Sequence, residues 1–184
     1  MCRSLPESLP ENFSMLEKAL RQIMKIYIAS PLFTQAERRW NSQLADALEE
    51  RGHSVSLPQV IVRDLISPDG TFQADGLFQA LTRELRDADV IVAVFDGADV
   101  DSGTSWECGF AFALGKPIVA LRTDIRRGGD SPTDVNLMLA ESATSIVHWP
   151  AFQQDLKPLA EAVEGHILRA SVRRGGNDDA PSIS

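Results

Sequence analysis

The feature that most constrains the fold is the alternation of short apolar segments with longer amphipathic ones. Residues 25–30, 89–95 and 116–122 read KIYIAS, DVIVAVF and KPIVALR, which are continuous apolar runs of strand length. Continuous apolar strands are typical of a sheet buried on both faces. Weaker strand-like runs occupy residues 53–58 and 143–149. The pattern predicts an α/β domain in which helices cover both faces of a parallel sheet.

The segments between these runs have helical periodicity. In residues 34–52, Trp40, Leu44 and Leu48 recur at every fourth position, and Gly52 follows as a stop signal. The further predicted helices are residues 77–88, 102–115 and 155–170. A helix between successive strands is the connection that parallel pairing requires.

The chain of 184 residues is long enough for one domain with a full core. We expect this single domain to span residues 24–172. Residues 1–23 are rich in Pro, Ser and Glu and are expected to form an N-terminal extension. Residues 173–184 are polar and rich in breakers, so we expect a disordered tail.

Composition excludes several classes of partner. The net charge of -8 argues against a nucleic-acid polymer, which requires a basic footprint. No apolar run is long enough to span a bilayer, so no membrane partner is expected. Cys2 and Cys108 form neither a metal-ligand spacing nor a disulfide framework, and a cytoplasmic location is expected. Glycine-rich dinucleotide and phosphate-binding patterns are absent, and no metal site is expected because the sequence has no zinc-ligand cluster.

Two loops follow the carboxyl ends of predicted strands, which is where ligands bind in open parallel sheets. One is residues 29–34, ASPLFT, and the other is residues 96–104, DGADVDSGT. The second leads into a helix start that carries Glu107 among apolar sequence neighbours. Partial desolvation would make this carboxylate a stronger nucleophile, and the helix N-terminus would keep it ionised.

Each of these residues also has a purely structural interpretation. Asp96 before a glycine is most often a turn residue, and a tyrosine at position 27 in a strand is more often core than catalytic. Cys108 is expected to be a small buried hydrophobe. Glu107 itself could be a helix-capping carboxylate, although a capping role does not need apolar neighbours.

Three stretches together resemble the nucleoside 2-deoxyribosyltransferases: KIYIASPLF, then DADVIVAVFDGADVDSGTSWECGFAFALGKPIVALRTD, then VNLML. The resemblance covers about residues 24–150. It implies a flavodoxin-like (Rossmann-like) fold and no cofactor. It also implies transfer of a 2-deoxyribosyl group from one nucleobase to another, with deoxynucleosides and free nucleobases as substrates.

The resemblance further implies roles for particular residues. Glu107 falls on the family's nucleophile, Tyr27 on the residue that orients it, and Asp101 on a residue that holds the sugar's 5′-hydroxyl. The implied substrate-binding residues are Ser30, Phe33, Asp96, Gly103, Asn136 and Met138. The resemblance also implies a homo-oligomer, in which Asn136 and Met138 could reach into a neighbouring subunit's site.

One position departs from the family pattern. Where members usually carry a base-contacting aspartate this chain has Leu81, followed by Thr82. A leucine can neither accept nor relay a proton at a base edge, so base recognition is expected to differ.

Two other functions compete with transfer. One is hydrolysis of the N-glycosidic bond of deoxynucleosides or nucleoside 5′-monophosphates, which would use the same fold and glutamate. The other is a non-catalytic nucleotide-binding or sensing domain. The combination of Tyr27, Asp101, Glu107 and Asn136 favours an enzyme.

Overall fold

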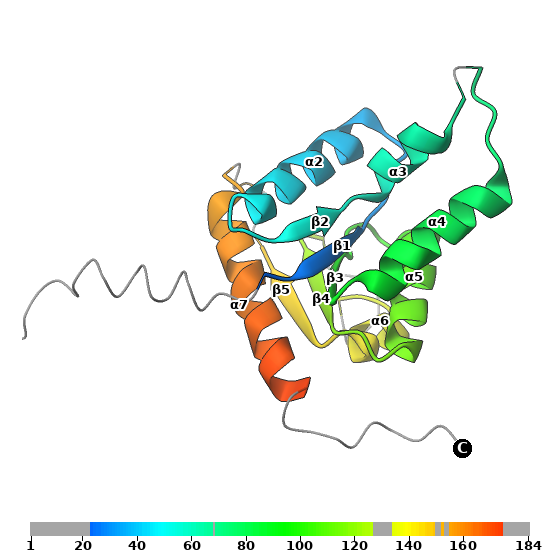
Figure 1. Cartoon of the computed structure of the whole chain (residues 1–184). Helices are drawn as coiled ribbons and strands as arrows, with labels where there is room; N and C mark the ends of the chain where they lie inside the picture. The colour runs from blue at the N-terminus through cyan, green and yellow to red at the C-terminus, as the bar shows by residue number, and fades with distance from the viewer. Residues whose placement is uncertain (1–22, 68, 127–133, 150–151, 153–154, 175–184) are drawn as a thin grey trace, which may run out of the picture.

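The structure is a computed structural model that describes residues 23–67, 69–126, 134–149, 152 and 155–174, with only the backbone described in 171–174. A parallel sheet of five strands in the order β2-β1-β3-β4-β5 forms its centre (Figure 1). The strands are β1 (Lys25–Ala29), β2 (Ser54–Ser56), β3 (Val90–Val94), β4 (Ile118–Arg122) and β5 (Ser145–His148). This order is that of the flavodoxin-like fold, so the predicted fold class is confirmed.

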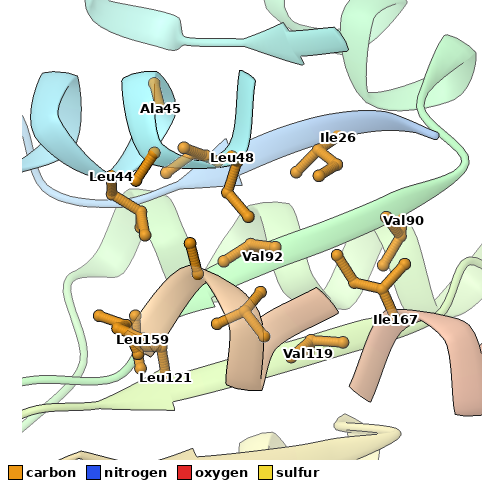
Figure 2. Close-up of a cluster of buried hydrophobic side chains, with 14 of the residues drawn as sticks. Ile26, Leu44, Ala45, Leu48, Val90, Val92, Val119, Leu121, Leu159 and Ile167 are labelled. Atoms are coloured by element: carbon orange, nitrogen blue, oxygen red, sulfur yellow. The ribbon is translucent and has the colours of Figure 1, made fainter. Parts of the chain in front are cut away.

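The helices are α2 (Gln35–Glu49), α3 (Pro58–Leu65), α4 (Ala74–Asp87), α5 (Ser102–Ala113), α6 (Leu137–Ser142) and α7 (Lys157–Arg174). Side chains alternate across the sheet, so that Ile26 and Ile28 face one layer while Tyr27 and Ala29 face the other. Leu44 of α2 belongs to the first layer, together with residues of α7 (Figure 2). Helices α4, α5 and α6 cover the second layer.

Two helices differ from the sequence prediction. Residues 53–58 were expected as one strand, but β2 ends at Ser56 and α3 begins at Pro58. Proline has no N–H to lose in the first turn and its fixed φ suits a helix start, so it favours the helix over a longer strand. Helix α6 was not predicted because it is a single short segment whose periodicity is too brief to detect.

The ends of the domain remain a prediction. Helix α7 continues through Arg174, two residues beyond the expected domain end at 172. Residues 1–22 of the expected extension and 175–184 of the expected tail lie outside the described residues. In the described part of the chain, no helix combines the length and the apolar character needed to cross a membrane.

The strand order reverses between β1 and β3, which pair directly in the middle of the sheet. In this topology, ligands usually bind beside the loops that leave the carboxyl ends of the strands where the order reverses. The loop after β1 leads to α2, and the loop after β3 leads to α5. The topology thus brings both candidate loops to one edge of the sheet.

Candidate active site

A hydrogen bond between two acidic side chains lies at the centre of the candidate site. Tyr27 lies in β1 and is fully buried. Its hydroxyl donates to Glu107 Oε1 of α5 at 2.5 Å. The two residues are 80 positions apart in the chain and meet because α5 packs on the face of the sheet to which Tyr27 points.

Glu107 is more weakly acidic than an ordinary glutamate. Burial raises its pKa to about 7, and the negative charge of Asp101 adds to this shift, while the hydrogen bond from Tyr27 opposes it. The residue lies in the second turn of α5, and no acidic residue lies in the first turn. The expected stabilisation by the helix N-terminus was wrong, because the helix dipole acts mainly within the first turn.

Tyr27 and Cys108 remain protonated beside this carboxylate. Burial raises the pKa of Tyr27, and the charge of Glu107 raises it further, so the phenol is a hydrogen-bond donor throughout the physiological range. Burial also raises the pKa of Cys108 to about 12. The cysteine is therefore a buried thiol and not a competing nucleophile.

Asp101 and Asn136 each cap a helix. Asp101 Oδ2 accepts from the Thr104 N–H at 3.0 Å at the start of α5. Asn136 Oδ1 accepts from the Met138 N–H at 2.9 Å at the start of α6. Capping thus occupies one oxygen of each side chain. It leaves the second carboxylate oxygen of Asp101 as an acceptor and the amide NH₂ of Asn136 as a donor.

Gly103 is exposed and lies close to the capping carboxylate. A Cβ at this position would come within 3.1 Å of Asp101 Oδ2. That distance is tighter than an ordinary van der Waals contact. The absence of a side chain at Gly103 therefore leaves room for Asp101 to adopt its capping position.

Asp96 and Ser30 are engaged within the loops. Asp96 Oδ1 accepts from the N–H groups of Thr123 at 2.6 Å and Asp124 at 2.9 Å, and Asp96 Oδ2 accepts from the Thr123 hydroxyl. Ser30 Oγ donates to Asn41 Oδ1 at 2.7 Å. These contacts tie the loop after β3 to the segment after β4, and the loop after β1 to α2.

Sequence reasoning missed the part that Arg122 plays in holding these loops. The side chain is buried. Its guanidinium donates to the carbonyls of Phe95 and Gly97, and to that of Arg126 at 2.8 Å. The signal in the sequence was a cation at the end of a buried strand, which requires nearby acceptors because an unpaired buried charge is costly.

Apolar side chains around the candidate site are exposed. Phe33, which the resemblance places against the nucleobase, is 71% exposed, and Met138 is 77% exposed. Trp106 stacks on Phe110 with ring centroids 5.2 Å apart. Trp106 and Phe112 are about half exposed, so these sequence neighbours of Glu107 do not form the enclosed apolar setting that the sequence suggested.

The position of the missing aspartate lies on α4. Leu81 is half-buried, and the neighbouring Thr82 is buried with its hydroxyl donating to the Phe78 carbonyl at 2.9 Å. Asp75, a carboxylate on the same helix, is exposed in the first turn of α4. Because the Thr82 hydroxyl already donates its proton to the helix backbone, it does not replace a carboxylate at the base edge. Among the described residues, no group of His, Cys, Asp and Glu could hold a metal ion.

Comparison with known proteins assigns the family. The model of the nucleoside 2-deoxyribosyltransferase family matches residues 26–138. The chain belongs to this family. The matched region includes Tyr27, Asp101, Glu107, Asn136 and Met138. No curated protein sequence matches the chain.

Several solved structures have a similar fold. A conserved protein from Enterococcus faecalis is 25% identical with a TM-score of 0.62, covering 80% of this chain and 99% of that chain. A 2-deoxyribosyltransferase from Bacillus psychrosaccharolyticus is 25% identical with a TM-score of 0.57, covering 74% and 90%. A CMP N-glycosidase from Clostridium botulinum is 21% identical with a TM-score of 0.50, covering 77% and 98%, and it shares the fold.

Proposed function

We propose that this deoxyribosyltransferase family member transfers a 2-deoxyribosyl group between nucleobases through a covalent glycosyl-enzyme on Glu107. The observation that carries the proposal is the Tyr27–Glu107 hydrogen bond of 2.5 Å, which joins the buried strand β1 to α5. Tyr27 holds one oxygen of the carboxylate, which leaves Oε2 to react. The family match and the 2-deoxyribosyltransferase among the structural neighbours support the substrate class.

The reaction proceeds in two displacement steps. In the first, Glu107 Oε2 forms a bond to the anomeric carbon while the N-glycosidic bond breaks and its electron pair leaves with the base. In the second, a ring nitrogen of another base attacks the anomeric carbon and releases the carboxylate, and the proton that this nitrogen loses balances the one that the departed base takes up. Water in place of the second base gives hydrolysis. The nucleophile must be ionised, and with a pKa of about 7 Glu107 is ionised in only part of the population at neutral pH.

Asp101 and Asn136 suit the sugar's 5′-hydroxyl. The second oxygen of Asp101 can accept the hydroxyl proton, and the amide of Asn136 can donate to the hydroxyl oxygen. A 5′-phosphate would instead meet the carboxylate of Asp101. At ~4 Å and an effective dielectric of ~20 this repulsion is about 4 kcal/mol, or roughly a thousandfold in affinity.

The nearby cations already interact with other protein groups, so they would do little to offset the repulsion between a 5′-phosphate and Asp101. Arg122 is buried against backbone carbonyls. Arg126 pairs with Asp124 at 2.5 Å. Arg127 lies outside the described residues. We therefore propose that free deoxynucleosides are the substrates and that monophosphates are poor ones.

The decisive experiment incubates the protein with one deoxynucleoside, with and without a second free base, and identifies the products. A new deoxynucleoside that forms only with the second base establishes transfer. Release of free deoxyribose at the same rate in both mixtures would assign hydrolysis instead. Binding without any product would assign the non-catalytic alternative.

A second comparison tests the preference for nucleosides. The values of kcat/KM are measured for a deoxynucleoside and its 5′-monophosphate, in wild type and in Asp101→Ser. We expect kcat/KM of the wild type to be higher for the nucleoside than for the monophosphate. Asp101→Ser should bring the two values of kcat/KM closer together. Equal or better use of the monophosphate by wild type would contradict the proposal and favour the hydrolase.

We also propose that a second copy of the chain covers the open side of the site. Phe33, Leu137 and Met138 are exposed apolar side chains beside a reaction that benefits from exclusion of water. Mixing Glu107→Gln with Asn136→Ala tests whether Asn136 acts across the interface. If it does, random mixing in equal amounts restores about a quarter of the sites, because mixed dimers contain one intact combination. No recovery in mixed dimers would place Asn136 in the same subunit as its Glu107.

A further inference from the structure

A cavity lies at the amino end of β5, on the face of the sheet away from Glu107. It has a volume of about 160 Å³ and is lined by Thr144, Ser145, His166, Arg169 and Ala170. Thr144 and Ser145 stand at the amino end of β5, where the Thr144 N–H bonds to the carbonyl of Ile118 at the first residue of β4. The other lining residues come from α7. A ligand at Glu107 cannot reach this cavity, because the sheet lies between them.

The charge of the cavity is opposite to that of the chain. The chain has a net charge of -8, yet none of the residues that line the cavity is acidic. Arg169 forms no ion pair with any carboxylate in the described part of the chain. The acidic residue of α7 next in sequence to the cavity, Glu164, pairs with Arg51 instead. The positive charge of Arg169 is therefore not balanced by a carboxylate among the described residues.

The hydroxyls in the cavity add hydrogen-bonding capacity. Ser145 Oγ is buried and has no hydrogen-bond partner. A buried hydroxyl without a partner destabilises the folded state, so its retention needs a reason. Alternation along β5 places Ser145 on the same face as Val147, which is the face covered by α7. Thr144 Oγ1 accepts from the Ile118 N–H at 3.1 Å and keeps its own proton to donate.

We propose that this cavity between β5 and α7 binds a small oxyanion, namely inorganic phosphate or the phosphate end of a monoester. Arg169 supplies the permanent charge, and the hydroxyls of Ser145 and Thr144 donate to the oxygens. The space is several times what a single water needs. His166 can report on anion binding: burial and the charge of Arg169 lower its pKa, and a bound anion should raise it.

The test is an NMR titration of the His166 ring signals with inorganic phosphate at constant ionic strength, balanced with sodium chloride. We expect a saturable shift and a rise in the pKa of His166. Arg169→Gln should weaken binding by about tenfold or more, because a charge-assisted hydrogen bond is lost. Arg39→Gln, an exposed arginine on α2, is the matched control and should leave binding unchanged.

Ser145→Ala separates a ligand role from a structural one. Removing an unpartnered buried hydroxyl should not lower the thermal stability of the empty protein, but it should weaken phosphate binding several-fold. A deoxynucleoside 5′-monophosphate and its unphosphorylated nucleoside distinguish the source of the anion: tighter binding of the monoester at His166 would identify it as the ligand. No saturable response to phosphate, or the same response in Arg169→Gln, would overturn the proposal and leave a water-filled cavity.

Discussion

Two glutamates of this protein are largely withdrawn from water, and their partners differ. Glu164 of α7 is 3% exposed and accepts from Arg51 Nε at 2.7 Å, with His53 Nε2 at 3.6 Å from its other oxygen. Glu107 of α5 accepts from the phenol of Tyr27, and no cation pairs with it among the described residues. Its pKa is about 7. The charge of Glu164 is neutralised by its surroundings, whereas no cation offsets the charge of Glu107, and a perturbed pKa of this kind is typical of functional carboxylates.

The largest expected effect is the loss of catalysis on changing Glu107. Glu107→Ala and Glu107→Gln should each lower kcat for the proposed base exchange by at least about a thousandfold, because each removes the carboxylate that we propose forms the covalent bond. The measurement is product formation from a deoxynucleoside and a second base, with circular dichroism as the folding control. Wild type should yield a sugar adduct on Glu107 by mass spectrometry. Substantial activity in a folded Glu107→Ala protein would contradict the proposed role of Glu107 as the nucleophile.

Glu164→Gln should lower the folding stability and leave kcat nearly unchanged. Removing the carboxylate leaves Arg51 without its partner, and breaking a buried ion pair costs about 3–5 kcal/mol. Arg51 is 20% exposed, so we expect about 3 kcal/mol, at the low end of that range. Urea denaturation measures the free energy of unfolding, and kcat per folded molecule should stay near the wild-type value. A loss of kcat equal to that of Glu107→Gln would show that the two carboxylates do not differ in role.

Stability against pH provides a third comparison. A raised folded-state pKa means that Glu107 favours folding most at acid pH. Its contribution is complete below the unfolded value of 4.5 and is lost as the pH rises through about 7. The difference in stability between Glu107→Gln and wild type should therefore shift in favour of the variant by about 3 kcal/mol between these pH values and stay constant above them. Denaturation of both proteins at pH 4.5, 6 and 8 measures the difference, and a difference independent of pH would contradict the raised pKa.

The smallest expected effect concerns Tyr27. Its hydrogen bond lowers the pKa of Glu107, so Tyr27→Phe should raise that pKa further and move the rising limb of kcat/KM against pH upward from about 7. Loss of one such hydrogen bond corresponds to about one pH unit. Activity at pH 6 should fall more than activity at pH 9. An equal loss at both pH values would assign Tyr27 to packing alone.

The sequence alone determined the architecture of this protein. Continuous apolar strands at residues 89–95 and 116–122 require a sheet covered on both faces, and parallel pairing follows from the helices between them. The sequence also singled out Glu107, because a carboxylate is uncommon in such a setting. Motif resemblance identified the family, which the family match confirmed.

Only the tertiary structure decided how the polar residues are used. Asp96 lies in the predicted site loop, but its oxygens bind Thr123 and Asp124, a contact between loops 27 residues apart. Glu107 lies beyond the reach of the helix N-terminus, and its pKa is set by burial and by Tyr27, 80 residues away. Burial and hydrogen bonding depend on groups that the fold brings together from distant segments, whereas periodicity is a local property that the sequence displays directly.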